Sequence, residues 1–432
     1  MRSNTIIQSV WPKTKEVWLL LLLLLTPFRA ITIVLSPLIV FFYYRRFHVR
    51  LGQQRRFAAL FVLFFISSGF GLIGGTTSLY SVVLSCVICL PMYFMLFGEP
   101  VGVASHDFMK KKFATPFMIM LVAVNLLGLC YWLFHGGGDE YGWAYGRHYE
   151  YVHGLAMIDS FIFLYYVIKL LYGHLSKKEW YLFIFISISL IACGYGLGFI
   201  CLFLTFLVFL LFMGRSKSLI ILLALGLSAY AVSQSSFFYY ERRNITKVIH
   251  RVDIRKLTMF EDFFKLVKDD PQILLLGTGP GGYNSRSTFL LCGDNENFIN
   301  KALGNVEPPY YKKYIYPLWN NSFVSQEAFT DGTRNKPYSN FVSIWAEQGL
   351  FFLAIVIIMY YYLIKRLKRY QKHRVGYHFL LALDTFMIIS LISHLWLETT
   401  EFMVYCLIRY YMLLSLKNEQ ALTDLDSSNS HS

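Results

Sequence analysis

The sequence predicts an all-α polytopic membrane protein with about twelve transmembrane helices and one large extracytoplasmic loop domain. Of the 432 residues, 56% are hydrophobic and 18% aromatic, and only 15% are charged, whereas a soluble chain carries about a quarter charged residues. Several stretches run to about twenty apolar residues, the length a helix needs to cross a bilayer. Basic residues gather between these stretches, as they do in membrane proteins.

The placement of the charges orients the chain. The net charge is +14, but the basic residues form clusters that separate apolar stretches, which is the positive-inside pattern and requires no nucleic acid. We therefore expect no nucleic-acid partner, a multi-pass protein, and cytoplasmic N- and C-termini. The clusters are Arg45, Arg46, Arg50, Arg55 and Arg56; Lys110–Lys112; Lys177 and Lys178; Arg215 and Lys217; and Lys365–Arg374.

Placing each cluster in the cytoplasm divides the chain. We expect the first apolar run to be a retained helix, because no small-residue cleavage site follows it. Residues 1–236 hold about nine helices and 339–416 about three. The predicted spans are 17–28, 31–44, 57–74, 77–97, 113–134, 153–172, 181–195, 197–213, 218–236, 339–364, 377–395 and 400–416. The polar segment 417–432 is predicted to be a disordered cytoplasmic tail.

Two segments fall outside the membrane: a short aromatic loop, 135–152, and a large loop, 237–338. Loops of this length without structure of their own are uncommon and often functional. Both are dense in Tyr and Trp, which fits either interfacial belts or stacking on sugar rings. Seven scattered cysteines exclude a disulfide framework, and the external histidines match no zinc spacing. We expect no metal and no cofactor.

The large loop contains Gly277-Thr-Gly279-Pro-Gly-Gly282, a literal GxGxxG. A dinucleotide site would need a βαβ unit around it, and this segment lies outside the membrane, where nucleotides are scarce. Glycines also supply positive φ and close backbone approach. We predict a turn at the membrane surface that presents Asn284 and Arg286.

Arginines are the external residues best suited to binding anions, because guanidinium groups match phosphate oxygens bidentately. Arg251 and Arg255 are four residues apart and would share one helix face. Arg147 lies in the short loop. The same residues could instead bind lipid headgroups unspecifically.

Acidic residues lie in or beside several spans. Glu347, where a helix begins, either faces headgroups or accepts a proton in a buried site. Charges inside a membrane are costly, and we predict Lys169 and Arg409 as neutralising partners for the others, which are Asp159, Asp384, Glu398 and Glu401.

The order of these motifs resembles the Wzy-type polysaccharide polymerases and the related O-antigen ligases. An Arg255…Asp-Asp-Pro271…Gly277-Thr-Gly279 segment precedes Pro-Tyr338-Ser-Asn and Ala-Glu347-Gln-Gly349-Leu. Arg147…His153-Gly154 is similar to the family's arginine-to-helix loop. Two departures point away from the ligases: Tyr338-Ser339 replaces a His-Asn pair, and Gly194-Tyr195-Gly196 replaces Ser-Arg-Gly.

The resemblance implies metal-independent, inverting glycosyl transfer on the outer face of a bacterial cytoplasmic membrane. The donor would be a glycan on undecaprenyl pyrophosphate and the acceptor a lipid-linked repeat unit. Membrane lipids, a chain-length regulator and a flippase would be the partners. The expected substrate-binding residues are Arg147, Arg251, Arg255, Arg286, Gly277, Gly279 and Asn284, and the candidates for acceptor activation are His153, His250, Tyr338 and Glu347.

Two other functions fit parts of the pattern. A flippase or other multi-pass transporter suits about twelve helices with both ends inside, but the halves show no repeat symmetry. A glycosyltransferase with a metal-binding acidic pair would use Asp139-Glu140, which lie in a short loop.

Overall fold

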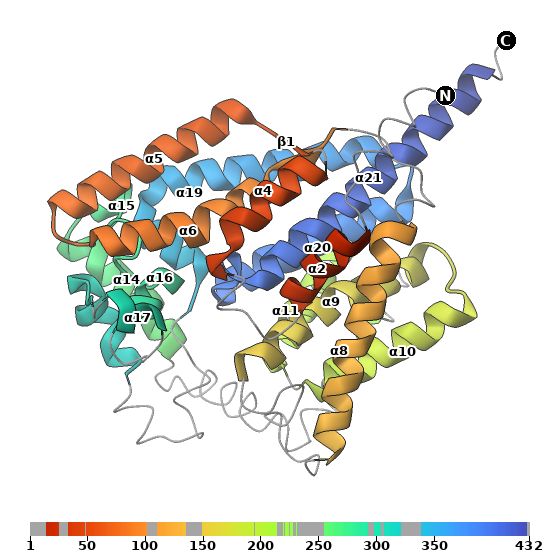
Figure 1. Cartoon of the computed structure of the whole chain (residues 1–432), viewed down its shortest axis with the longest axis horizontal. Helices are drawn as coiled ribbons and strands as arrows, with labels where there is room; N and C mark the ends of the chain where they lie inside the picture. Colours follow the sequence, from red (N-terminus) through yellow and green to blue (C-terminus); the bar gives the residue numbers. More distant parts are fainter. Residues whose placement is uncertain are drawn as a thin grey trace.

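The computed structural model shows a helical protein (Figure 1). It describes residues 14–25, 33–47, 49–101, 110–134, 149–193, 195–213, 219, 221–223, 225–227, 230, 255–292, 298–303, 306–320 and 338–429. Within these ranges, six helices are long and apolar enough to cross a membrane. The chain is therefore an all-α, multi-pass membrane protein, as predicted.

The first helices follow the predicted apolar stretches. Those that define the first half are α2 (Thr14–Leu25), α4 (Ser36–Arg46), α5 (Gln54–Ile73), α6 (Leu79–Leu96), α8 (Thr115–Phe134), α9 (Tyr149–Tyr172), α10 (Lys177–Ala192) and α11 (Gly196–Met213). Side-chain caps start two of them. Ser78 caps α6, and Ser176 forms a capping box with Glu179 at the start of α10. Most of the predicted span 218–236 lies outside the described residues.

Short helices fill the described part of the predicted large loop. They are α14 (Arg255–Asp269), α15 (Ile273–Leu276), α16 (Arg286–Leu291) and α17 (Phe298–Leu303), followed by single turns at Tyr311–Ile315 and Tyr316–Leu318. Figure 1 shows them together at one end of the molecule. They share a hydrophobic cluster that includes Phe263, Tyr283 and Ile315 and reaches the start of α19 through Val342 and Ala346.

Three helices complete the chain: α19 (Asn340–Leu367), α20 (Arg374–Ser393) and α21 (Thr400–Asn429). The structure differs from the predicted disordered tail, because α21 continues to Asn429. Each residue added to an existing helix gains a hydrogen bond without the cost of nucleation. Local bonds such as Thr423 Oγ1 to the Glu419 carbonyl accompany the polar segment.

A two-stranded antiparallel sheet was not predicted from sequence. Strands β1 (Val49–Leu51) and β2 (Gly98–Pro100) pair Arg50 with Glu99, and Glu99 also accepts from Arg366 at the end of α19. The sheet lies among the basic clusters, so we call this side of the helices the basic end. Helices α9, α19 and α20 all extend from the basic end to the opposite end, and that opposite end carries few basic residues.

Of the two predicted neutralising partners, Arg409 is confirmed as the partner of an intramembrane acid, and the prediction for Lys169 is wrong. Arg409 Nε donates to Asp384 Oδ1 at 3.1 Å, and Tyr405 donates to the same oxygen at 2.7 Å. Lys169 instead pairs with Glu179 at the start of α10, because both lie near the basic end. Asp159 is fully buried and accepts from Asn125 Nδ2 at 2.9 Å.

Candidate functional site

Helix α19 is broken where it approaches the end opposite the basic clusters. Gly349 has φ 83° and ψ 170° inside the helix, a conformation that favours glycine. A Cβ there would lie 2.1 Å from the Leu275 carbonyl oxygen. A break removes backbone hydrogen bonds that must be replaced in a region shielded from water.

The glycine turn supplies the replacements. The Thr278 N–H donates to the Ala346 carbonyl at 2.8 Å and the Gly279 N–H to the Glu347 carbonyl at 2.9 Å. Gly277 (φ 76°) approaches so closely that a Cβ would lie 2.4 Å from the backbone of Glu347. The predicted positive φ and close backbone approach at Gly277 and Gly279 are confirmed. The backbone that Gly277 approaches is that of α19, and Gly279 also approaches Gly71 of α5. Both glycines therefore contact protein.

The Glu347 carboxylate locks the same turn. It accepts from the backbone N–H of Gly281 at 2.6 Å, of Tyr283 at 3.1 Å and of Ser285 at 2.8 Å, and from the Thr288 hydroxyl at 3.2 Å. Its side chain is 1% exposed. Four donors occupy the oxygens, so Glu347 anchors the turn, a different role from the predicted acceptor activation.

The turn does not present Asn284 to a ligand. Its side chain is fully buried, with Nδ2 3.2 Å from the Met259 sulfur, where the sequence predicted a surface residue. The side chain points toward Met259 of α14, which belongs to the hydrophobic cluster of the short helices. Arg286 starts α16 and is half-buried, and its N–H donates to Glu398 Oε2 at 2.5 Å.

Glu398 is the second buried carboxylate at this end. It lies in a 3-10 turn, η7 (Trp396–Glu398), that joins α20 to α21, and it is 2% exposed. Burial, and next the nearby Glu347 carboxylate, raise the pKa of Glu398 to about 7, against the lowering effect of the Arg286 N–H. A carboxyl group that titrates near neutral pH is suited to proton transfer.

A row of aromatic rings crosses this end of the molecule. The ring centroids of His153 and Tyr195 are 4.7 Å apart, those of Tyr195 and Trp396 6.0 Å, of Trp396 and His394 4.8 Å, and of His394 and Tyr338 5.2 Å. We call these five residues the aromatic row. Through three intervening rings it connects two of the predicted residues, His153 in α9 and Tyr338 just before α19.

Hydrogen bonds fix the row in place. The Asn340 N–H donates to the His394 carbonyl at 3.1 Å, and Asn340 Oδ1 accepts from the Leu397 N–H at 2.8 Å. The Leu395 N–H donates to His394 Nδ1 at 2.8 Å, so in neutral imidazole the proton is on Nε2. Asn340 Nδ2 and Trp396 Nε1 are buried donors without a partner among the described residues. Buried donors of this kind are rare, and here one lies at the start of α19 and the other in η7, the turn that Asn340 contacts.

The structure therefore places part of the predicted site. His153, Tyr338 and Arg286 lie around η7. Arg255 begins α14, but its side chain, like Arg147, His250 and Arg251, lies outside the described residues. Sequence reasoning missed His394 and Trp396, although the turn Ser-His-Leu-Trp-Leu-Glu between two apolar stretches combines ring and carboxyl groups unusually for a short connection.

The arrangement combines a carboxyl group with a near-neutral pKa, two half-buried imidazoles and the half-buried ring of Tyr338. These groups can move a proton and pack against a flat apolar face, as a sugar ring presents. Among the described residues, no three His, Cys, Asp or Glu side chains are placed to hold a metal ion.

Compared with known proteins, the chain matches no family model, no curated protein and no solved structure.

Proposed function

We propose that the chain polymerises lipid-linked oligosaccharide repeat units into surface polysaccharide, as a Wzy-type polymerase does. The observation that carries the proposal is the aromatic row, which joins His153 and Tyr338 beside Glu398 and Arg286. The order of motifs in the sequence supports the same function, because each motif that the structure describes lies at or against this end.

The proposal includes a topology. Positive-inside placement puts the basic end in the cytoplasm, so the aromatic row faces the outer side of a bacterial cytoplasmic membrane. About twelve helices span it, with both termini inside and residues 237–338 as an external loop domain. The lipid-linked donor and acceptor would then reach the site from the outer leaflet.

Glycosyl transfer from a pyrophosphate places two demands on the site. The leaving group develops negative charge, which arginines can stabilise; Arg286 lies beside η7, and Arg147, Arg251 and Arg255 are further candidates from the sequence. The acceptor hydroxyl must lose its proton, and Glu398, with its near-neutral pKa, is the best-suited acceptor of that proton. The anomeric bond to pyrophosphate breaks as the new glycosidic bond forms, with inversion and without metal.

His394 supplies an imidazole near the position where the ligases have their His-Asn pair. Tyr338-Ser339 stands where the ligases have that pair, and the His394 ring lies 5.2 Å from the Tyr338 ring. With Nδ1 accepting the Leu395 N–H, the other nitrogen donates in the neutral ring. We therefore assign His394 to hydrogen bonding with substrate oxygens, and proton removal to Glu398.

The test is the length of the surface glycan in a deletion strain that is complemented with variants at matched membrane levels. Wild type should restore long chains, whereas Glu398→Gln and His394→Ala should leave single repeat units. Tyr361→Ala is the control, because this tyrosine is exposed near the basic end, and it should behave as wild type. Long chains in the deletion strain, or loss of even single units from its surface, would reject polymerisation, and the second result would favour a flippase.

A further inference from the structure

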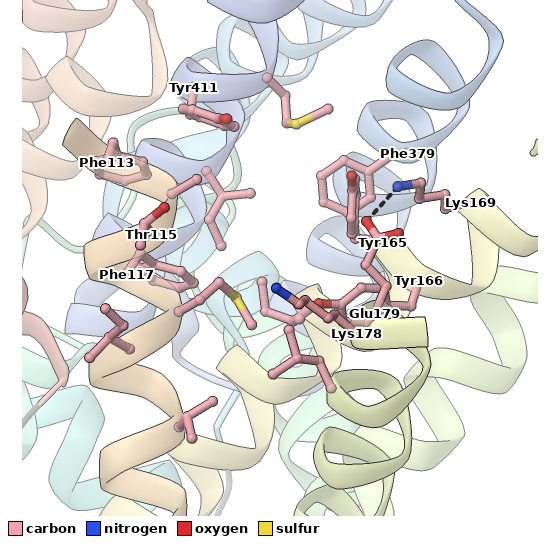
Figure 2. Close-up of a pocket in the computed structure, with 18 of the residues that line it drawn as sticks. Phe113, Thr115, Phe117, Tyr165, Tyr166, Lys169, Lys178, Glu179, Phe379 and Tyr411 are labelled. Atoms are coloured by element: carbon pink, nitrogen blue, oxygen red, sulfur yellow. Dashed lines mark hydrogen bonds and ion pairs between the residues drawn. The ribbon is translucent and has the colours of Figure 1, made fainter. Parts of the chain in front are cut away.

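A separate crevice opens between helices at the basic end. It has a volume of about 1000 Å³ and is lined by α8, α9, α10, α20 and α21 (Figure 2). Its walls are aromatic and aliphatic, with Phe117, Tyr166 and Phe379 among them. The only described charges that line it are Lys169, Glu179 and Lys178, all from the basic end of α9 and α10.

Lys169 and Glu179 neutralise each other, whereas Lys178 has no such partner among the described residues. Lys169 Nζ lies 2.5 Å from Glu179 Oε1. The other oxygen of this carboxylate, Oε2, accepts from the Ser176 N–H in the capping box. Lys178 has no ion pair among the described residues, and Figure 2 shows its side chain reaching between Phe117 and Tyr166. The crevice thus carries one uncompensated positive charge at its edge.

The lining residues place the crevice toward the basic end. The stretch from Phe113 to Leu126 comes from the turn Lys110–Ala114 and the part of α8 that follows it, and Ile162 to Lys169 come from the end of α9. Phe379 is five residues into α20, and Ile408 to Met412 belong to α21. Most of the lining residues lie toward the ends of α8, α9, α10 and α20 that adjoin basic clusters. The positive-inside rule assigns this side to the cytoplasmic leaflet.

We propose that this crevice binds an anionic phospholipid of the cytoplasmic leaflet, with an acyl chain among the apolar walls and the phosphate on Lys178. Ligand sites of about 300–1,000 Å³ are mostly apolar with a few fixed polar groups. Basic pockets between transmembrane helices on the cytoplasmic side bind anionic headgroups. Charge complementarity selects the anionic lipid over a zwitterionic one, since Lys178 provides a positive charge and the Lys169–Glu179 pair provides none.

The test measures lipid-dependent stability of the purified chain in detergent. Phosphatidylglycerol and phosphatidylcholine with identical acyl chains are titrated while the melting temperature is recorded. We expect phosphatidylglycerol to raise the melting temperature of wild type, and Lys178→Ala to weaken its apparent affinity about fivefold. Lys178→Arg should restore it. Lys177→Ala is the matched control, because Lys177 is exposed and adjacent but does not line the crevice.

A second variant tests the acyl chain. Ala123→Trp fills the crevice and should abolish the rise in melting temperature with either lipid. The Lys177→Ala protein should keep the wild-type rise. Equal effects of Lys177→Ala and Lys178→Ala, or equal stabilisation by the two lipids, would overturn the proposal. These results are independent of glycan length, so this inference and the proposed polymerase activity can fail separately.

Discussion

Two buried carboxylates of this protein are neutralised in different ways. Glu347 is held by three backbone N–H groups of the segment Gly281–Ser285 and by the Thr288 hydroxyl of α16. Asp384, in α20, is held by the Arg409 guanidinium and the Tyr405 hydroxyl from α21. One site depends on the conformation of a backbone and the other on the charge of a side chain.

The difference decides which changes each site tolerates. An ion pair can be replaced as a unit, because removing both charges removes the desolvation cost with the attraction. Backbone amides cannot be removed, so Glu347 has no compensating second substitution. Where function needs a fixed polar turn inside a helical protein, the backbone gives the more rigid support.

The largest expected effect is at the helix break. Gly349→Ala places a Cβ 2.1 Å from the Leu275 carbonyl oxygen and requires φ 83°, so we expect a loss of more than about 4 kcal/mol. Fluorescence-detected size exclusion should show little monodisperse protein. Gly69→Ala in α5, where nothing lies within 4 Å of the added Cβ, should be neutral or stabilising. A monodisperse Gly349→Ala protein would show that the turn does not impose the break.

The ion pair should be sensitive to single changes and tolerant of a double one. Arg409→Met leaves Asp384 buried and unpaired, and we expect a cost of about 3–5 kcal/mol. Asp384→Leu combined with Arg409→Met should recover most of the melting temperature. Failure of the double variant to recover would mean that Tyr405 and Tyr360, whose hydroxyls lie 2.7 Å apart, depend on the charges.

Glu347→Gln preserves shape but turns one acceptor into a donor that faces a backbone N–H. At least one amide loses its partner, and we expect a loss of about 2 kcal/mol, seen as a lower melting temperature in detergent. Glu398→Gln, which keeps an acceptor for the Arg286 N–H, should cause no loss at neutral pH. Equal losses in both variants would contradict the assignment of Glu347 as the anchor.

The smallest effect is a pH dependence from Glu398. A folded-state pKa of about 7, above the ordinary value, means that the folded chain binds the proton more tightly. Its contribution to stability is complete below pH ~4.5 and is lost as pH rises through 7, by about 1 kcal/mol between pH 6 and 8. Melting temperatures recorded across this range should fall for wild type and stay level for Glu398→Gln. Parallel curves would exclude titration of this group.

Local pattern predicted much of the fold from the sequence. Apolar length and basic clusters predicted an all-α, multi-pass membrane protein, and the glycines at 277 and 279 predicted positive φ. The sequence could not predict what the turn packs against, because Gly277 meets the backbone of Glu347, and Gly349 that of Leu275, only through long-range contacts. For the same reason Asn284, polar in a glycine-rich turn, was expected at the surface, whereas Met259 buries it. His394 was missed because its significance depends on Tyr338, more than fifty residues earlier in the chain.

The bond between the glycine turn and α19 also sets an order of assembly during synthesis. Gly281 precedes Glu347 by 66 residues, so the turn leaves the ribosome well before the carboxylate that holds it. Segments made first fold first where they can, but these amides have to wait for α19. Docking of the segment that carries the turn and entry of α19 into the membrane are therefore coupled in a single late step of biogenesis.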